Sequence, residues 1–145
     1  MLPGLVPFVV ALVISCSGSG PTGVIGFDVG GAWIEVSTLA LDECGTSIPT
    51  TSTTDVTIIY GGGTQITFVF HFAQGDLALP GTFNTETHAF VLPYADSDPQ
   101  TGNTVVGAQS GTFTSESNYT STTEVVLTVD GESCTVRSNE VAQRV

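Results

Sequence analysis

The stretch that decides the fold is Gly-Ala-Trp-Ile-Glu-Val-Ser-Thr-Leu-Ala-Leu-Asp-Glu-Cys, residues 31–44. Trp33 and Cys44 each have a natural partner near the C-terminus, Arg144 and Cys134 respectively. Opposed residues of an antiparallel strand pair have a constant sum of residue numbers. The sum is 177 for Trp33 with Arg144 and 178 for Cys44 with Cys134. One register therefore serves both contacts to within a residue, which predicts that the first strand pairs with the last and closes a barrel.

The rest of the chain shows the two-residue alternation of β-strands rather than a helical period. The clearest case is a hairpin around the glycines at 61–63, where apolar residues alternate on both sides of the turn. Strands are predicted at residues 32–41, 55–60, 64–72, 76–83, 87–94, 108–119, 123–130 and 133–141. Eight strands with mostly short links predict an all-β, eight-stranded antiparallel up-and-down β-barrel, with a β-sandwich as the alternative.

Four connecting features accompany these strands. The Thr- and Ser-rich residues 46–54 and the polar residues 95–104 are predicted to be loops. A turn is expected near residues 120–121, and a bulge at Pro80 and Gly81. Residues 24–29 place Ile25, Phe27 and Val29 on one face, which predicts either a short strand or a plug across one barrel end.

A Gly-x-Trp at the start of the first strand, with an Arg beyond the last, resembles the lipocalin signature. Cys44 followed by Gly45 is similar to small lipocalin-like lipoproteins of bacteria. The resemblance implies a lipocalin-like barrel that can hold a small apolar ligand and whose closed end is sealed by Arg144 stacked on Trp33.

Large apolar side chains of the predicted strands share the face expected to point inward. They would line a pocket for an apolar ligand or fill a packed core that needs none. These candidate lining residues are Ile66, Phe68, Phe70, Phe72, Phe90, Leu92 and Leu127.

The N-terminus has the features of an export signal. Residues 1–15 contain an apolar run of ten residues, too short for a bilayer that needs about 20, which predicts a signal peptide. Val13-Ile14-Ser15-Cys16 resembles a lipobox, which implies that Cys16 becomes the lipidated first residue. Residues 16–22 would then be the anchor and a flexible tether, and residues 23–145 the barrel domain. A conventional signal peptide cut slightly later is the alternative, since no Lys or Arg precedes the run.

The chain has three cysteines. With Cys16 in the anchor, Cys44 and Cys134 remain to form a disulfide, as export favours. The alternative is a pair of free buried thiols in a reducing cytosol.

Fourteen acidic residues face two arginines and no lysine, a net charge of −12. Such a surface repels phosphate backbones and argues against nucleic acid as a partner. It would not adhere to anionic lipid headgroups, so membrane attachment would depend on acyl chains. The sequence predicts an exported protein anchored to the bacterial cell envelope, with the outer membrane as the expected site.

Candidate catalytic and metal-binding residues are few. The chain has two histidines, His71 and His88, and their spacing supplies no metal site. Glu86 and Glu116 could be imagined as a glycosidase pair, but carboxylates at strand edges are nearly always solvated. Asp96-Ser97-Asp98 lacks the twelfth-position Glu of a calcium loop. We expect no enzyme activity, metal or cofactor.

These observations favour a lipid-anchored lipoprotein whose lipocalin-like barrel binds a small apolar ligand. The alternative is a filled β-domain that acts as a structural or protein-interaction lipoprotein. A hydrolase, the third hypothesis, would require a cleft with convergent carboxylates or a partnered histidine.

Overall fold

The computed structural model describes residues 26–145. These residues form eight β-strands. They are β1 (Gly31–Asp42), β2 (Thr51–Ile59), β3 (Gln65–Phe72), β4 (Gly75–Phe83), β5 (Ala89–Ser97), β6 (Thr104–Ser115), β7 (Asn118–Val129) and β8 (Glu132–Arg144). Within this part of the chain, no helix has the length and apolar character needed to cross a bilayer.

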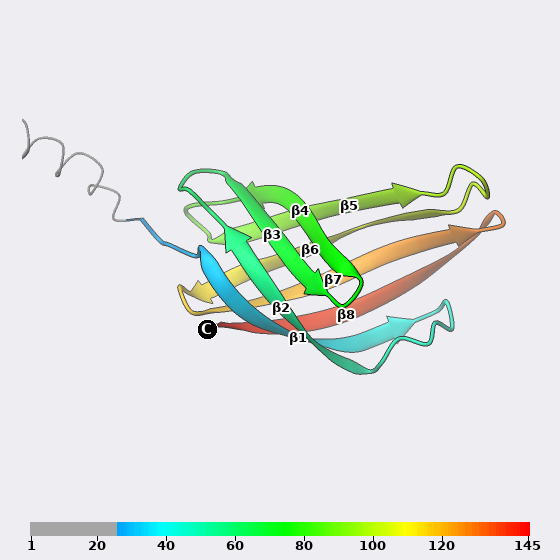
Figure 1. Cartoon of the computed structure of the whole chain (residues 1–145), viewed down its shortest axis with the longest axis horizontal. Coiled ribbons are helices and arrows are strands. Elements are labelled where there is room, and N and C mark those ends of the chain that lie inside the picture. The colour runs from blue at the N-terminus through cyan, green and yellow to red at the C-terminus, as the bar shows by residue number, and fades with distance from the viewer. Residues whose placement is uncertain (1–25) are drawn as a thin grey trace, which may run out of the picture.

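The strands form one closed barrel in sequential order, with every neighbouring pair antiparallel. Figure 1 shows strands β5 to β8 running along one side of the barrel and strands β2 to β4 crossing over the other. The up-and-down barrel predicted from the sequence is confirmed.

Closure depends on the pairing of β1 with β8, which has the predicted register. Trp33 lies opposite Arg144, and the same residue sum of 177 holds as far as Leu39 and Ser138. The register then shifts by one residue between Leu39 and Leu41. Beyond this irregularity the sum is 178, the value of the disulfide between Cys44 and Cys134, whose Cα atoms lie 5.2 Å apart. The one-residue difference seen in the sequence is therefore a β-bulge, and the predicted disulfide is confirmed.

Several element boundaries differ from the prediction. Residues 51–54 are strand rather than loop, because β1 offers them a pairing partner, with Thr38 opposite Thr51. The loop predicted at 95–104 shortens, since β5 continues to Ser97 and β6 begins at Thr104. The turn expected near 120–121 lies earlier, between Ser115 and Asn118, because the Thr and Ser residues that follow it pair along β6.

No bulge occurs at Pro80, which lies in regular register opposite Thr67. The adjacent Gly81 has a different role. A Cβ atom there would lie 2.1 Å from the carbonyl oxygen of Val91, so glycine is required for β4 to approach β5. The recorded pairing of β4 with β5 is confined to Thr82 with Val91 and Phe83 with Phe90. Figure 1 shows the two strands diverging beyond this short seam.

Aromatic side chains fill one end of the barrel, which we call the closed end. Phe68 is fully buried and packs against Phe90 and Tyr119 at ring-centroid distances of 4.8 and 5.6 Å. Trp33 packs against Phe113 and Tyr119 at 5.6 and 5.4 Å. Such edge-to-face and tilted pairs contribute beyond the area that they bury. This half of the barrel is a packed core.

Residues 26–30 cover the closed end as a plug, the second of the two predicted alternatives, while Ile25 lies outside the described residues. Val29 is fully buried, and its carbonyl oxygen accepts a hydrogen bond from Trp33 Nε1 at 3.0 Å. Phe27 stacks on the ring of His88 with centroids 3.8 Å apart. The described part of this segment contains no strand.

The disulfide predicts a large dependence of stability on oxidation. On the chain-entropy model, a bridge that closes a loop of this length stabilises the fold by about 4 to 5 kcal/mol. We expect the double variant Cys44→Ser, Cys134→Ser to lose roughly that free energy in urea unfolding. Reductant should lower the wild type to the level of the variant and leave the variant unchanged; an unchanged wild type would contradict the prediction.

Two phenylalanines on the same face of β3 provide a test of the packed half. Phe68 is 0% exposed, whereas Phe72 is 45% exposed. We expect Phe68→Ala to destabilise the protein by about 3 to 5 kcal/mol, because truncation leaves a cavity among aromatic rings. Phe72→Ala, the matched control, should cost much less. Equal losses in chemical denaturation would show that the two ends are packed alike.

Candidate functional site

Beyond the aromatic core, the barrel interior contains a cavity of about 260 Å³, which we call the cup. It lies past Phe70 on the side of the β3–β4 turn. The cup has two unlike walls. Its apolar wall consists of Phe70, Phe72, Leu77, Leu79, Tyr94, Ala108 and Val125, and its polar wall includes Glu35, Ser37, Gln109, Thr123, Ser138 and Glu140.

The apolar wall comes mainly from β3 and β4, whose inward positions alternate with exposed ones. Phe70 pairs with Leu77, and Phe68 below it pairs with Leu79. Tyr94 of β5 faces this hairpin across the region where β4 and β5 are no longer paired. Apolar side chains therefore border the cup on both sides of the diverging strands.

The polar wall comes from β1, β6, β7 and β8. Glu35 is two residues after Trp33 in β1, so both side chains point inward. In β8, Glu140 lies two residues before Ala142, which pairs with Glu35. The two carboxylates are consequently diagonal neighbours on adjacent strands, and they are 6% and 2% exposed.

A hydrogen-bond network holds these carboxylates. The Tyr119 hydroxyl and the Gln109 amide both donate to Glu35 Oε2, at 2.6 and 2.7 Å. Gln109 also donates to the Ser121 hydroxyl at 2.8 Å, and Ser121 donates to Glu140 Oε2 at 2.9 Å. Ser138 donates to Glu140 Oε1 at 2.5 Å. The network fixes both acidic groups at the boundary between the packed core and the cup.

Burial raises the pKa of Glu35 above its usual value of 4.5. The hydrogen bonds from Tyr119 and Gln109 oppose this shift by stabilising the carboxylate, while repulsion from Glu140 adds to it. Burial also raises the pKa of Tyr119, and the nearby Glu35 charge adds to that rise, so the phenol remains protonated and acts as a donor.

The candidate lining residues divide into three groups. Ile66, Phe68, Phe90 and Leu92 are almost completely buried in the core at the closed end. Phe70 and Phe72 line the cup. Leu127 instead borders a separate pocket formed with the β5–β6 loop and the strand ends beside it.

The residues that sequence reasoning missed are Glu35, Leu77, Leu79, Tyr94, Gln109 and Glu140. Strand alternation could have found Glu35, because it shares the face of Trp33, and Glu140, because it shares the face of Arg144.

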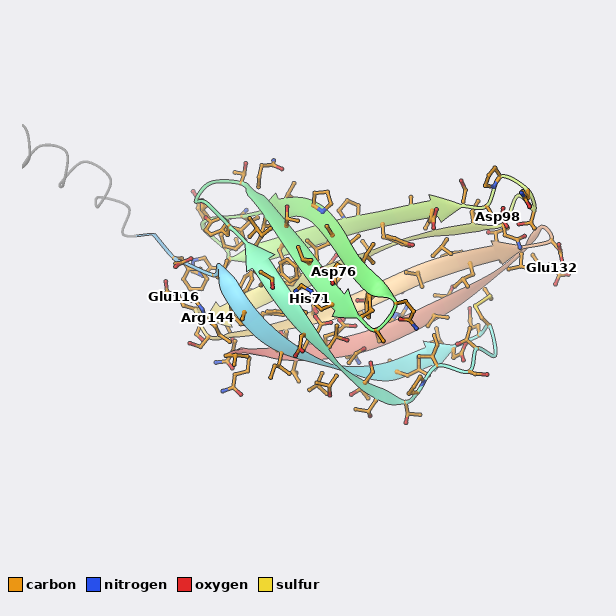
Figure 2. All side chains as sticks on the ribbon, viewed as in Figure 1. His71, Asp76, Asp98, Glu116, Glu132 and Arg144 are labelled. Atoms are coloured by element: carbon orange, nitrogen blue, oxygen red, sulfur yellow. A yellow bond between two sulfur atoms is a disulfide. The ribbon has the colours of Figure 1, made fainter. Side chains whose placement is uncertain are left out.

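The structure places Trp33 and Arg144 opposite each other at the closed end. The Arg144 guanidinium donates to the carbonyl oxygens of Asp28 at 3.0 Å and Glu116 at 3.3 Å, and also to that of Gly30. It thereby ties the plug and the β6–β7 turn to the last strand, as Figure 2 shows for Glu116 and Arg144. Stacking of the cation on the indole stays a prediction. The proposed lipid-bearing Cys16 lies outside the described residues.

The remaining candidates lie elsewhere on the surface. His71 is on the outer face, where its ring nitrogens contact Asp76 and Thr57, each at 2.8 Å. Glu116 accepts a hydrogen bond from the Asp28 amide in the β6–β7 turn region, and Glu86 is in the β4–β5 turn. In residues 26–145, no cluster of three or more His, Cys, Asp or Glu side chains could hold a metal ion.

Asp98, at the opposite end of the barrel from Arg144 in Figure 2, belongs to a simple turn. Its carboxylate accepts the Gln100 amide at 2.9 Å, and its own main chain bonds to Asn103 and Gly102. Hydrogen bonds from Gln100 and Thr101 lower the pKa of Asp98. The Asp98 carboxylate therefore accepts a main-chain hydrogen bond within its own turn.

No protein-family model matches the chain, and no curated protein matches it. Among solved structures, a match is "Monomer form of M.tuberculosis PknI sensor domain", with 13% sequence identity and a TM-score of 0.49. It covers 80% of this chain and 86% of that chain. A likeness this distant carries no argument about function.

The buried Glu35 predicts a specific pH dependence. A carboxyl whose pKa is higher in the folded than in the unfolded protein favours folding less as pH rises through the interval between the two values. Glu140 and Tyr119 face Glu35 and are the titratable groups coupled to it. We expect the stability of Glu35→Gln relative to the wild type to increase from pH 4.5 upward, measured by urea unfolding. A constant difference across this range would contradict the prediction.

Proposed function

We propose that the chain is an exported, lipid-anchored barrel protein that binds a small, largely apolar molecule in the cup. The observation that carries the proposal is the unequal filling of the barrel. Aromatic rings pack the closed end completely, whereas the interior beyond Phe70 leaves about 260 Å³ open. Cores close-pack by default, so an interior space bordered by seven apolar side chains favours an occupant.

The volume of the cup limits the size of the ligand that it can hold. Pockets for drug-sized ligands usually measure about 300 to 1,000 Å³. The cup lies near the lower end of that scale, so it suits a compact molecule. The two buried carboxylates at its polar wall disfavour a ligand that enters with a carboxylate head, such as a fatty acid.

Export is supported by the disulfide between Cys44 and Cys134, because such bridges persist in oxidising compartments. The lipobox-like residues 13–16 supply the anchor in this proposal. An acyl anchor would hold the barrel at a membrane surface despite the net charge of −12. The bacterial cell envelope, with the outer membrane as the expected site, is the location that we propose.

A second function, as a protein-interaction module, is favoured by one observation. The outer face of β1 and β8 exposes Ile34 and Val141, which are 38% and 57% exposed, and Val145, just after β8, is 79% exposed. Apolar surface of this kind can mark a contact with another protein. A barrel that served this function alone would take up no ligand in the experiment below.

The test is uptake of a neutral apolar dye, N-phenyl-1-naphthylamine, by the purified oxidised protein. We expect saturable binding of one dye per chain with increased dye emission. Val125→Trp, which fills the cup, should abolish binding. Val126→Trp, on the outer face of the same strand, is the matched control and should bind as the wild type does. The proposed site would be rejected if both variants still bound the dye, or if the wild type took up none.

A further inference from the structure

The polar wall of the cup contains two buried acidic groups that no cation from residues 26–145 pairs with. In residues 26–145, the three ion pairs join Asp76 to His71, Glu124 to Arg137 and Asp28 to Arg144. Glu35 and Glu140 take part in none of these pairs. Buried charges in proteins are normally paired, so this arrangement leaves a place for a positive charge from outside the chain.

The hydrogen bonds identify which oxygen is available. Both oxygens of Glu140 accept hydroxyl groups, from Ser138 and Ser121. In Glu35, Oε2 accepts two hydrogen bonds, whereas Oε1 has no partner among the described residues. Within the same residues, no fully buried side-chain oxygen lacks a partner. Glu35 Oε1 must therefore reach the open space of the cup, although the residue as a whole is 94% buried.

The surroundings of this oxygen restrict the ligand chemistry. An anionic group would be repelled by Glu35 and Glu140 together. A neutral apolar molecule would fit the wall of Phe70, Leu77 and Leu79 but would separate Glu35 Oε1 from water without replacing its hydrogen bonds. A molecule with an apolar body and a positively charged nitrogen satisfies both walls.

We propose that the cup binds a small primary amine, whose ammonium group donates to Glu35 Oε1 beside Glu140 and whose apolar body lies against Phe70, Phe72 and the β4 leucines. The proposal rests on the proposed function, because it specifies the ligand of the same cup. Glu140 strengthens the attraction for the cation, and the hydrogen bonds from Tyr119 and Gln109 hold Glu35 in position.

The experiment compares three ligands of nearly equal shape that differ in charge: 2-phenylethylamine, 2-phenylethanol and 3-phenylpropionate. Each is titrated against the purified oxidised protein holding N-phenyl-1-naphthylamine, and displacement of the dye is measured. We expect the amine to bind roughly tenfold or more tightly than the alcohol, as a charge-assisted hydrogen bond in a buried site provides. The propionate should displace least.

Two variants test whether Glu35 causes the preference for the amine over the alcohol. Glu35→Gln should bring the affinities for the amine and the alcohol close to equality while the dye still binds. Glu132→Gln is the control, because it removes the same charge from an exposed position at the far end of the barrel, as Figure 2 shows. The control should keep the wild-type preference. The ligand series on the wild type remains decisive even where Glu35→Gln fails to fold.

The outcomes separate the two proposals. If the dye binds in the cup but the amine competes no better than the alcohol, the amine proposal is overturned and the proposed function stands. If the dye does not bind, the proposed function fails as well. An amine preference that persists in Glu35→Gln would overturn the assignment to this carboxylate. Displacement of the amine by Ca²⁺ at equal concentration would overturn the amine in favour of a metal ion.

Discussion

The pairing of β1 with β8 is the interaction on which the barrel depends, because it joins the two strands that are farthest apart in the sequence. It begins at Trp33 and Arg144 and continues through a bulge after Leu39. A disulfide then fastens it covalently, between Cys44 just past the end of β1 and Cys134 near the start of β8. Neither β1 nor β8 is left as an edge. The same pairing brings Glu35 and Glu140 onto neighbouring strands, so the polar wall of the cup is a product of barrel closure.

The interior changes its character along the barrel axis. At the closed end, four different strands each contribute an inward-pointing ring, and these rings fill the space. They belong to Trp33, Phe68, Phe113 and Tyr119. Two residues farther along β1 and β7, polar side chains replace the rings, as in Glu35 and Ser121, whereas β3 continues with Phe70. Tyr119 bridges the two levels, with its ring in the core and its hydroxyl on Glu35. The packed rings of the closed end thus hold Tyr119, which in turn orients Glu35 at the polar wall of the cup.

Much of this fold could be predicted because strand alternation is visible within short segments and because two pairs of residue numbers are enough to give the register of β1 with β8. They were sufficient for the number of strands, the closure and the disulfide. Strand boundaries were predicted wrongly where the composition is typical of a loop. The Thr- and Ser-rich residues 51–54 form a strand only because they pair with β1. The cup was predicted only in part. Phe70 and Phe72 were identified by apolarity, but Glu35 was missed because a carboxylate in a strand is usually solvated.

The short seam between β4 and β5 has a consequence for association with other chains. Past Thr82 and Val91 the two strands are no longer paired with each other, and a strand margin of this kind is a template that an added strand recognises. Pro80 and Pro93 lie on these margins and lack an N–H, and Asp76 and Asp96 add charge. These residues discourage edge-to-edge polymerisation at the gap between the two strands.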